Sequence, residues 1–355
     1  MSVAAIAHAA DWSPSLQVTA DVTPSEWDRF VSRQPHATGY HAWKWREVFE
    51  RAFGHETLYL AARDHGSIVG VLPMVLFKSR LFGRFAVSLP FVNYGGVLAR
   101  DAAAAACLLD RAAALREEHR LAHVELRHTA RQFPDLEART HKVGMLLTLE
   151  RDVAEAWERL DRKVRNQVRK AEKSQMTARS GGVELLDGFY GVFARNMRDL
   201  GTPVYARAFF AEVLAAFPET ARVFLVDAGD VTVAGAITLS FRDTIENPWA
   251  SSLREYRTMS PNTLLYWRMI EHAIATGHKT FDFGRSTPNE GTYTFKAQWG
   301  AQPTPLHWEY VLGAGCRLPN LSPSNPKYRA AIGLWTRLPL TVANFLGPHI
   351  VRSIP

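Results

Sequence analysis

The sequence lacks most of the features that identify familiar enzyme or secreted-protein classes. Cys107 and Cys316 are its only cysteines, far apart and without metal-spaced partners, which argues against a disulfide framework and favours a reducing cytoplasm. It has no Walker loop, G-x-S-x-G elbow, H-E-x-x-H motif or paired-cysteine zinc site, so no metal site is predicted. No apolar run approaches the roughly 18 residues of a membrane-spanning helix. Residues 1–15 lack the basic and apolar regions of a signal peptide and are predicted to form a flexible lead-in.

The composition of the sequence is that of an ordinary folded protein. Of its 355 residues, 47% are hydrophobic and 22% are charged, which is enough for a large core and about two domains. The net charge of +7 and the isoelectric point near 9.5 favour acidic partners such as phosphates, nucleotides, RNA or an anionic membrane surface. This excess is too modest for the length to choose among them, and DNA is not an expected partner.

An internal repeat indicates two domains with the same plan. Residues 58–74 align without gaps on residues 223–239, and each stretch has two β-rich runs around a polar turn. An apolar run, a long helix and a short strand follow each hairpin, at residues 84–91, 101–119 and 123–126 and again at 244–251, 262–276 and 279–283. This order of elements predicts that each domain has a mixed sheet with helices on its faces, which is an α/β or α+β fold. We predict domains at residues 16–150 and 151–313 and a tail at 314–355 with two short helices.

The most informative stretch is residues 281–310, FDFGRSTPNEGTYTFKAQWGAQPTPLHWEY. Phe281 and Phe283 indicate a buried strand, which runs into a polar loop that carries Arg285 and Ser286. Lys296 follows on a neighbouring element. Cations and turn residues at the end of a buried strand suit the binding of an anionic ligand, although an ordinary strand and loop would contain the same residue types.

Four other stretches carry weaker signals. A helix at 159–173 has seven Lys and Arg residues against two acidic ones, which fits either a phosphate-binding surface or a solvated face. Residues 196–210 form a helix–turn–helix corner around Gly201 and Pro203. In residues 90–96, Asn93 and Tyr94 precede paired glycines, which fits either close approach of a ligand or a tight turn. The tail at 329–352 mixes apolar residues with arginines, so it either packs on the protein or contacts a membrane interface.

Together these motifs resemble a known family. FDFGRS followed by G-x-Y-x-F-K-x-x-W-G-x-x-P resembles the C-terminal signature of the FemAB-like branch of the GNAT acyltransferases, and within it the proteins associated with exosortase (PEP-CTERM) and exopolysaccharide loci. The segments KVRNQVRKAEKS (163–174), RNMRDLGTPVY (195–205) and NPKYRAAIGLWTRLPLTVANFLGP (325–348) match the same group. The resemblance covers the chain from about residue 40 to its end. None of the motifs specifies a substrate.

The resemblance implies tandem GNAT-like domains with a helical C-terminal tail, and acyl transfer to an amine or, as a second choice, to a hydroxyl. Lys296 and Arg285 would stabilise the anionic intermediate or hold a donor phosphate. Lys163, Arg165 and Arg169 would bind a phosphate-bearing donor or acceptor near the groove between the domains. The other candidates are, for acceptor binding, Thr202, Tyr205, Asn93, Tyr94 and Ser286, and, for the general base, Asp199 and Glu255.

The donor and the acceptor are less well defined. The phosphate-binding Q/R-x-x-G-x-G/A loop of CoA-dependent GNAT enzymes is not evident, and the nearest substitute is the helix start at Ser260 and Asn262, where Ser260 is the predicted N-cap. The expected donor is an acyl-CoA or an aminoacyl-tRNA, used as a co-substrate without a bound cofactor. The resemblance implies an exopolysaccharide or lipid-linked glycan precursor as acceptor. The cysteine usage predicts a cytoplasmic protein, and a tail that contacts a membrane interface would place it peripherally at the inner face of the membrane. Two alternatives are a non-catalytic assembly factor and a basic RNA- or membrane-binding module.

Overall fold

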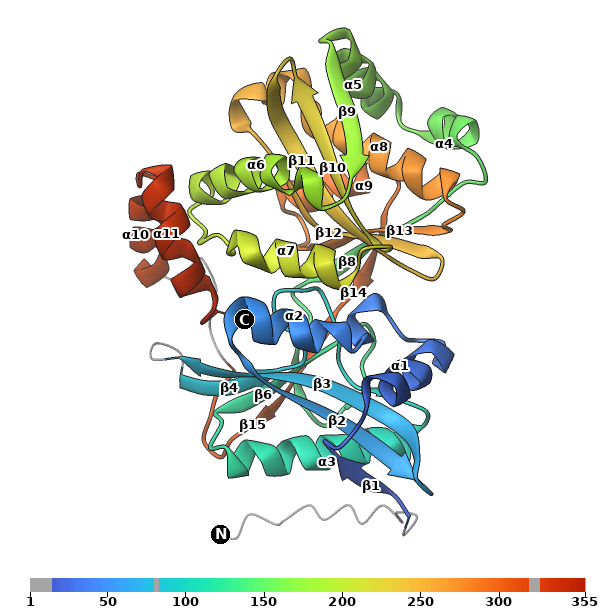
Figure 1. Cartoon of the computed structure of the whole chain (residues 1–355), viewed down its shortest axis with the longest axis vertical. Helices are drawn as coiled ribbons and strands as arrows, with labels where there is room; N and C mark the ends of the chain where they lie inside the picture. Colours follow the sequence, from blue (N-terminus) through green and yellow to red (C-terminus); the bar gives the residue numbers. More distant parts are fainter. Residues whose placement is uncertain (1–14, 80–82, 319–325, 355) are drawn as a thin grey trace.

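Two lobes lie one above the other along the long axis of the protein (Figure 1). The structure is a computed structural model that describes residues 15–79, 83–318 and 326–354. Residues 1–14, which make up almost all of the predicted lead-in, lie outside the described residues, as do residues 319–325 of the predicted tail.

A mixed sheet forms the framework of the first lobe. The elements of this lobe are α1 (Pro24–Arg33), α2 (Lys44–Phe53), α3 (Ala102–Glu118), the short 3₁₀ helix η1 (Gly39–His41), β1 (Gln17–Thr19), β2 (Glu56–Asp64), β3 (Ser67–Ser79), β4 (Gly83–Val87), β5 (Leu98–Ala99), β6 (His123–His128), β7 (Glu137–Arg139) and β15 (His307–Leu312). The described strands lie in the order β1-β2-β3-β4-β6-β15-β7, with β5 beside β3. Helix α3 covers one face of the sheet, and α1 and α2 cover the other (Figure 1).

The second lobe repeats this layered arrangement. Its elements are α4 (Val153–Arg159), α5 (Arg162–Lys173), α6 (Leu186–Asp199), α7 (Arg207–Ala216), α8 (Pro261–Ala275), α9 (Gly291–Ala297), the 3₁₀ helices η2 (Val183–Leu185) and η3 (Arg254–Met259), β8 (Val143–Thr148), β9 (Met176–Gly181), β10 (Ala221–Ala228), β11 (Val231–Phe241), β12 (Thr244–Ser252), β13 (Thr280–Ser286) and β14 (Gln302–Pro305). Its described strands lie in the order β14-β8-β13-β12-β11-β10-β9. Helices α6 and α7 cover one face and α5 and α8 the other. The tail forms α10 (Pro326–Trp335) and α11 (Leu340–Val351) beside α6.

The predicted internal repeat is confirmed. In each lobe an antiparallel hairpin (β2–β3 or β10–β11) leads to a third strand, then to a crossover helix (α3 or α8) and a final strand. That final strand pairs with the third strand in parallel, as β6 does with β4 and β13 with β12. The mixed α/β fold class and the two helices of the tail are also confirmed.

The predicted domain boundaries are wrong for two strands. Strand β8 was assigned to the first domain but pairs with β13 and β14 in the second sheet. Strand β15 was assigned to the second domain but pairs with β6 and β7 in the first sheet. The apolar pattern of a strand predicts that it is buried but does not identify its partner strand. The exchange of these strands ties the two lobes together.

A hydrophobic core shared by both lobes fixes how they sit relative to each other. One cluster of buried residues lies between the first sheet and α3, and another between the second sheet and the helices α5 and α8. The central cluster draws from both lobes and includes Phe49 on α2, Phe209 on α7 and Trp249 on β12. Helix α2 also packs on α7. A site built from both lobes can therefore be held in a fixed geometry.

Candidate active site

Strands β12 and β13 separate partway along the second sheet. They pair over only three residue pairs, the last of which places Glu246 beside Asp282. Strand β12 then has a bulge in which Asn247 and Pro248 face one residue of β11, and proline suits a bulge because it has no N–H for the ladder. Strand β13 has a second bulge opposite β8, where Gly284 has a φ of 73°. The sheet therefore opens directly after the two carboxyl groups.

Glu246 and Asp282, which we call the acid pair, are buried, with exposures of 8% and 1%. The Tyr40 hydroxyl donates a hydrogen bond to Glu246 Oε1 at 2.6 Å, and the Asn93 amide donates to the same oxygen. The Tyr94 hydroxyl donates to Asp282 and lies 3.3 Å from Glu246 Oε2. Because a hydroxyl has one hydrogen and two lone pairs, Tyr94 can donate to Asp282 while it accepts from a protonated Glu246. The first lobe thus supplies a hydroxyl bridge between two carboxyl groups of the second.

The environment of the acid pair retains one proton at neutral pH. Burial, followed by the nearby charge of Asp282, raises the pKa of Glu246 to about 8. Burial also raises the pKa of Asp282, but hydrogen bonds from Tyr94 and from the Gly284 N–H oppose this effect, as does the charge of Lys296. Two buried carboxyl groups this close resist ionising together. We therefore assign the proton to Glu246 and the negative charge to Asp282.

Lys296 lies on α9 and reaches back to the second bulge. Its side chain is buried, and Nζ donates to the backbone oxygens of Gly284 at 3.1 Å and Arg285 at 2.9 Å. Burial lowers its pKa to about 8, although the charge of Asp282 opposes this shift. An ammonium group has three N–H donors, so one remains for an oxyanion near the opening in the sheet.

A cavity of about 590 Å³ between the lobes reaches the acid pair. Its lining residues include Tyr40, Tyr94, Glu246 and Asp282, and many of the others are aromatic or carry a hydroxyl group: Trp45, Phe217, Phe241, Thr38, Thr129, Thr220, Ser240, Thr244, Thr280 and Thr304. The charged residues of the lining include Arg242 and three acidic residues, Asp243, Glu246 and Asp282. Such a cavity suits a neutral or cationic ligand better than a phosphate.

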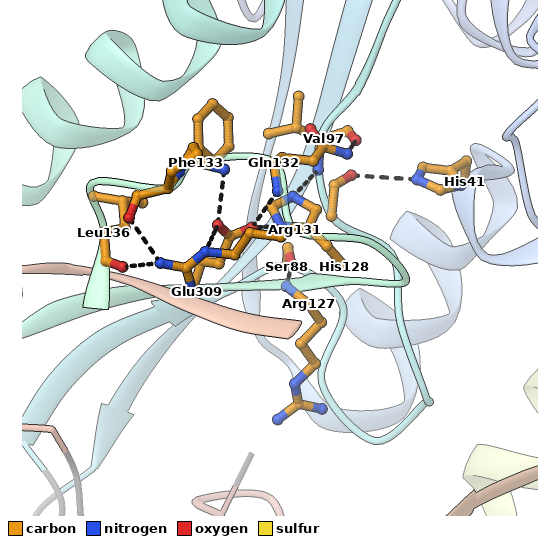
Figure 2. Close-up of polar contacts among 12 residues, drawn as sticks. His41, Ser88, Val97, Arg127, His128, Arg131, Gln132, Phe133, Leu136 and Glu309 are labelled. Atoms are coloured by element: carbon orange, nitrogen blue, oxygen red, sulfur yellow. Dashed lines mark hydrogen bonds and ion pairs between the residues drawn. The ribbon is translucent and has the colours of Figure 1, made fainter. Parts of the chain in front are cut away.

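Buried histidines hold the loop at residues 88–97, which carries Asn93 and Tyr94 (Figure 2). His128 Nε2 accepts from the Val97 N–H at 2.9 Å, so its Nδ1 carries the hydrogen and donates to Glu309 at 2.6 Å. His41 Nε2 lies 3.2 Å from the Gly96 oxygen, and its other ring nitrogen accepts a backbone N–H. Burial lowers the pKa of both rings, to about 4 for His41, so both are neutral at pH 7.

The same loop is closely packed and strained. Leu89 and Phe91 have φ angles of 54° and 68°, a left-handed conformation that bulky residues rarely adopt. A Cβ at Gly96 would lie 2.0 Å from the His128 ring. The backbone is therefore held in one conformation, which fixes where Asn93 and Tyr94 meet the acid pair.

The predicted donor site lies at the start of α8. Ser260 and Asn262 line a depression of about 340 Å³ together with Arg257 and Gln298. The N-terminus of a helix attracts anions through its unpaired N–H groups. Ser260 occupies the predicted N-cap position before Pro261, but its φ is 63° and its side chain makes no capping hydrogen bond.

The basic helix, α5, lies beside this depression and on the far side of the second lobe from the first (Figure 1). The predicted position near the groove between the domains is therefore wrong, and so is the start of the helix, which begins at Arg162 and not at Arg159. Lys163 lines an open surface depression, Arg165 pairs with Glu158 at 3.0 Å, and Arg169 lies over the Trp157 ring. These cations can reach a donor at α8 but not a ligand between the lobes.

Several other predicted residues are not brought to the acid pair. Asp199 pairs with Arg198 at 2.6 Å, and Glu255 pairs with Arg195 at 2.8 Å on the surface. Neither carboxylate lines the cavity between the lobes. The turn residue Thr202 is exposed, whereas the Tyr205 ring packs in the central aromatic cluster.

Arg285 and Ser286 follow the second bulge on β13. Among the described residues, neither side chain forms an ion pair or a hydrogen bond with a carboxylate. The Arg285 guanidinium lies 5.5 Å from the centre of the Trp308 ring, and its Nη1 has no hydrogen-bond partner among the described residues. Burial and the nearby charge of Arg127 lower the pKa of Arg285. The Ser286 hydroxyl is buried and has no described partner either. Both can donate to an anion, but they do not line the cavity.

Sequence reasoning missed Tyr40, Glu246 and Asp282. A signal existed for the two carboxylates, because Glu246 follows Ile245 and Asp282 lies between Phe281 and Phe283 in predicted strands, and a buried charge has to be paired or functional. No local signal marks Tyr40, which is 206 residues from Glu246 in the sequence.

Comparison with known proteins supports the fold. Residues 158–297 match the acetyltransferase (GNAT) domain. The chain is similar to the crystal structure of FemX, with a TM-score of 0.62, 16% identity, and coverage of 83% of this chain and 97% of that chain. No curated protein matches the sequence.

Two further solved structures share this fold. The C-terminal domain of a putative lysylphosphatidylglycerol synthetase from Agrobacterium fabrum has a TM-score of 0.57 at 11% identity, over 82% of this chain and 92% of that chain. L-PGS from Bacillus licheniformis has a TM-score of 0.53 at 11% identity, over 89% of this chain and 96% of that chain. The chain therefore has a tandem GNAT-like fold similar to that of FemX, and residues 158–297 of its second lobe match the acetyltransferase (GNAT) domain.

Proposed function

We propose that this protein is an N-acyltransferase that transfers an acyl group from an activated donor to an amine bound between the lobes. The observation that carries the proposal is the acid pair at the point where β12 and β13 separate, with Lys296 at the adjoining bulge. Acyl transfer to an amine needs a group that removes a proton and a group that stabilises an oxyanion. The acid pair fits the first role and Lys296 the second.

In the proposed reaction, the amine nitrogen attacks the acyl carbonyl carbon. A C–N bond forms, and the bond from that carbon to the donor's sulfur or oxygen breaks. The proton lost by the amine passes to the acid pair, and the leaving group receives one proton in return. Ionised Asp282 attracts the ammonium form of the substrate, takes the first of its protons to free the attacking amine, and later releases that proton to solvent. Protonated Glu246, with a pKa of about 8, is suited to give its proton to the leaving group and to accept the second proton that the amine loses.

We propose an amino sugar of an exopolysaccharide or other cell-envelope glycan precursor as the acceptor. Aromatic rings such as Trp45 and Phe241 can cover the apolar face of a sugar, and the hydroxyl-bearing residues of the lining can bond to sugar hydroxyls. The acidic end of the cavity favours an amine over a hydroxyl as the attacking group.

The donor would bind on the other side of the opening, at the start of α8. An acyl-CoA and an aminoacyl-tRNA both carry phosphates that fit the helix N-terminus, Arg257 and the adjacent basic helix. The acyl group would then reach the acid pair between β12 and β13.

The test combines two donors with two acceptors. Purified protein is mixed with acetyl-CoA or a charged tRNA pool, and with a glucosamine glycoside or the matching glucoside, and products are identified by mass spectrometry. We expect an amide product from the glucosamine glycoside with one donor, little ester from the glucoside, and none from Glu246→Gln. Calorimetric titration of each donor with wild-type protein and Lys296→Ala identifies which donor binds. Donor binding without any transfer, unaffected by Glu246→Gln, would instead favour the assembly-factor alternative.

A further inference from the structure

The two tail helices pack on the second lobe through a narrow face. In α11, the small residues Ala343 and Gly347 and the terminal Val351 are buried, four residues apart, and so lie on one side of the helix. A Cβ at Gly347 would lie 2.9 Å from the backbone of Val204, so the helix lies directly on the turn that follows α6. This contact fixes which side of α11 faces the protein.

Outside this buried stripe, the two tail helices expose apolar side chains. Val342, Phe345, Leu346 and Ile350 of α11 and Leu334 of α10 are each at least 36% exposed, with Phe345 and Leu334 at 71% and 67%. We call these five side chains the tail face. Of the eight large hydrophobic residues exposed in the described parts of the chain, these are five. A soluble surface seldom gathers its exposed apolar side chains in this way without a binding role.

The charge of the same segment has one sign. After Glu309 the sequence contains no Asp or Glu, whereas it has five basic residues, Arg317, Lys327, Arg329, Arg337 and Arg352. Arg337 and Arg352 are exposed. Apolar side chains flanked only by cations are the composition of helices that lie in the interface of an anionic membrane.

We propose that the tail face docks on an anionic lipid surface, with Phe345 and Leu334 in the apolar layer and Arg337 and Arg352 at the headgroups. A symmetric contact with a second copy would bring together two patches that both carry cations, because the same patch is used on both sides. The described residues contain no helix long and apolar enough to cross a membrane, so the contact is peripheral. The proposal does not rest on acyl transfer.

Vesicle flotation of the full-length chain tests this proposal. We expect binding to vesicles of phosphatidylcholine mixed with phosphatidylglycerol to be about tenfold or more tighter than to phosphatidylcholine alone. Phe345→Ser with Leu334→Ser should abolish most of the binding, and Arg337→Glu with Arg352→Glu should abolish its dependence on anionic lipid. Val183→Ser with Val231→Ser, at 59% and 46% exposure in other parts of the protein, and Arg120→Glu are controls that should bind like the wild type.

Three outcomes would overturn the proposal. One is equal or absent binding to the two kinds of vesicle. Another is loss of binding on Lys163→Glu with Lys170→Glu but not on the serine changes in the tail, which would assign the lipid contact to the basic helix. The third is a wild-type dimer in sedimentation velocity that the tail variants convert to monomer while lipid binding stays unchanged. Circular dichroism of each variant verifies that the fold is retained.

Discussion

The two lobes share one order of elements but differ in the residues of their parallel strand pair, which is β4–β6 in the first lobe and β12–β13 in the second. In the first lobe the last parallel pair joins Val87 to Glu125, and in the second it joins Glu246 to Asp282. Glu125 is neutralised within its own lobe by Arg127, at 2.7 Å. In the second lobe a carboxyl group faces a carboxyl group, and the strands separate beyond it. The same scaffold therefore offsets its buried carboxylate by an ion pair in one lobe and places two carboxyl groups side by side in the other, and the second arrangement fits the proposed proton transfer.

The first lobe also lacks an opening at this position and contributes in another way. The Ser88 N–H donates to the backbone oxygen of Glu125 at 2.8 Å. The chain after β4 therefore stays beside β6, whereas β12 and β13 diverge at the equivalent position of the second lobe. The loop that follows carries Asn93 and Tyr94 into the second lobe's site. The second lobe thus supplies the acid pair, and the first lobe supplies side chains that hold it.

Removal of either member of the acid pair should have the largest effect on activity. We expect Glu246→Gln and Asp282→Asn each to lower kcat/KM by about 10²–10⁴-fold, the usual contribution of a general base. The matched change in the first lobe, Glu125→Gln, leaves Arg127 buried without its partner and should lower the free energy of unfolding by about 3–5 kcal/mol. Its kcat, measured on the folded fraction, should stay close to that of the wild type. Equal losses of kcat in both lobes would contradict the comparison.

Lys296→Met should have the next largest effect. Loss of one oxyanion donor typically costs about 2.7–4 kcal/mol in the transition state. We expect kcat to fall while the KM values for both substrates change little, because the ammonium group acts on the intermediate. Steady-state kinetics with Lys142→Met, a partly buried lysine that bonds to Thr287, serves as control. A rise in the donor KM at constant kcat would instead assign Lys296 to donor binding.

The acid pair should also make stability fall as pH rises. Glu246 titrates near 4.5 when unfolded but near 8 in the folded protein, so between these values the folded state binds a proton that the unfolded state has released. The free energy of unfolding should therefore decrease by roughly 1.4 kcal/mol per pH unit at most across this window. Thermal unfolding of wild type and Glu246→Gln, compared from pH 5 to 8, measures the difference in slope. Parallel curves would show that Glu246 is ionised throughout.

A smaller effect should follow from loosening the loop that carries Asn93 and Tyr94. Glu309→Gln weakens the hydrogen bond to His128, which in turn holds the Val97 N–H. We expect kcat to fall about tenfold, because displaced side chains no longer align the acid pair. The pKa seen in the pH–rate profile should shift as well, which a loss of stability alone would not cause. Glu137→Gln, exposed on β7, is the control and should change neither quantity.

Sequence patterns predicted the elements of each lobe because hairpins, crossover helices and caps are local. They also drew attention to Lys296, which follows a buried strand and a polar loop. The carboxylates were missed because residues 244–251 were interpreted as an apolar run and Asp282 lies between two phenylalanines. Their pairing depends on the register of β12 with β13, and the contact from Tyr40 depends on how the lobes pack. Neither the register nor the packing leaves a periodic pattern in the sequence.

The smallest effect should come from the carboxylates that the family resemblance suggested as the base. Asp199 forms a partly exposed ion pair and Glu255 an exposed one, both outside the cavity, and pairs near the surface contribute about 0–1 kcal/mol. Asp199→Asn and Glu255→Gln should therefore retain nearly full kcat/KM and leave the pH–rate profile unchanged. A large loss in either variant, with Glu246→Gln still active, would move the proton acceptor to the donor side of the sheet. The contrast between the lobes would then describe how buried charge is tolerated and not how the reaction proceeds.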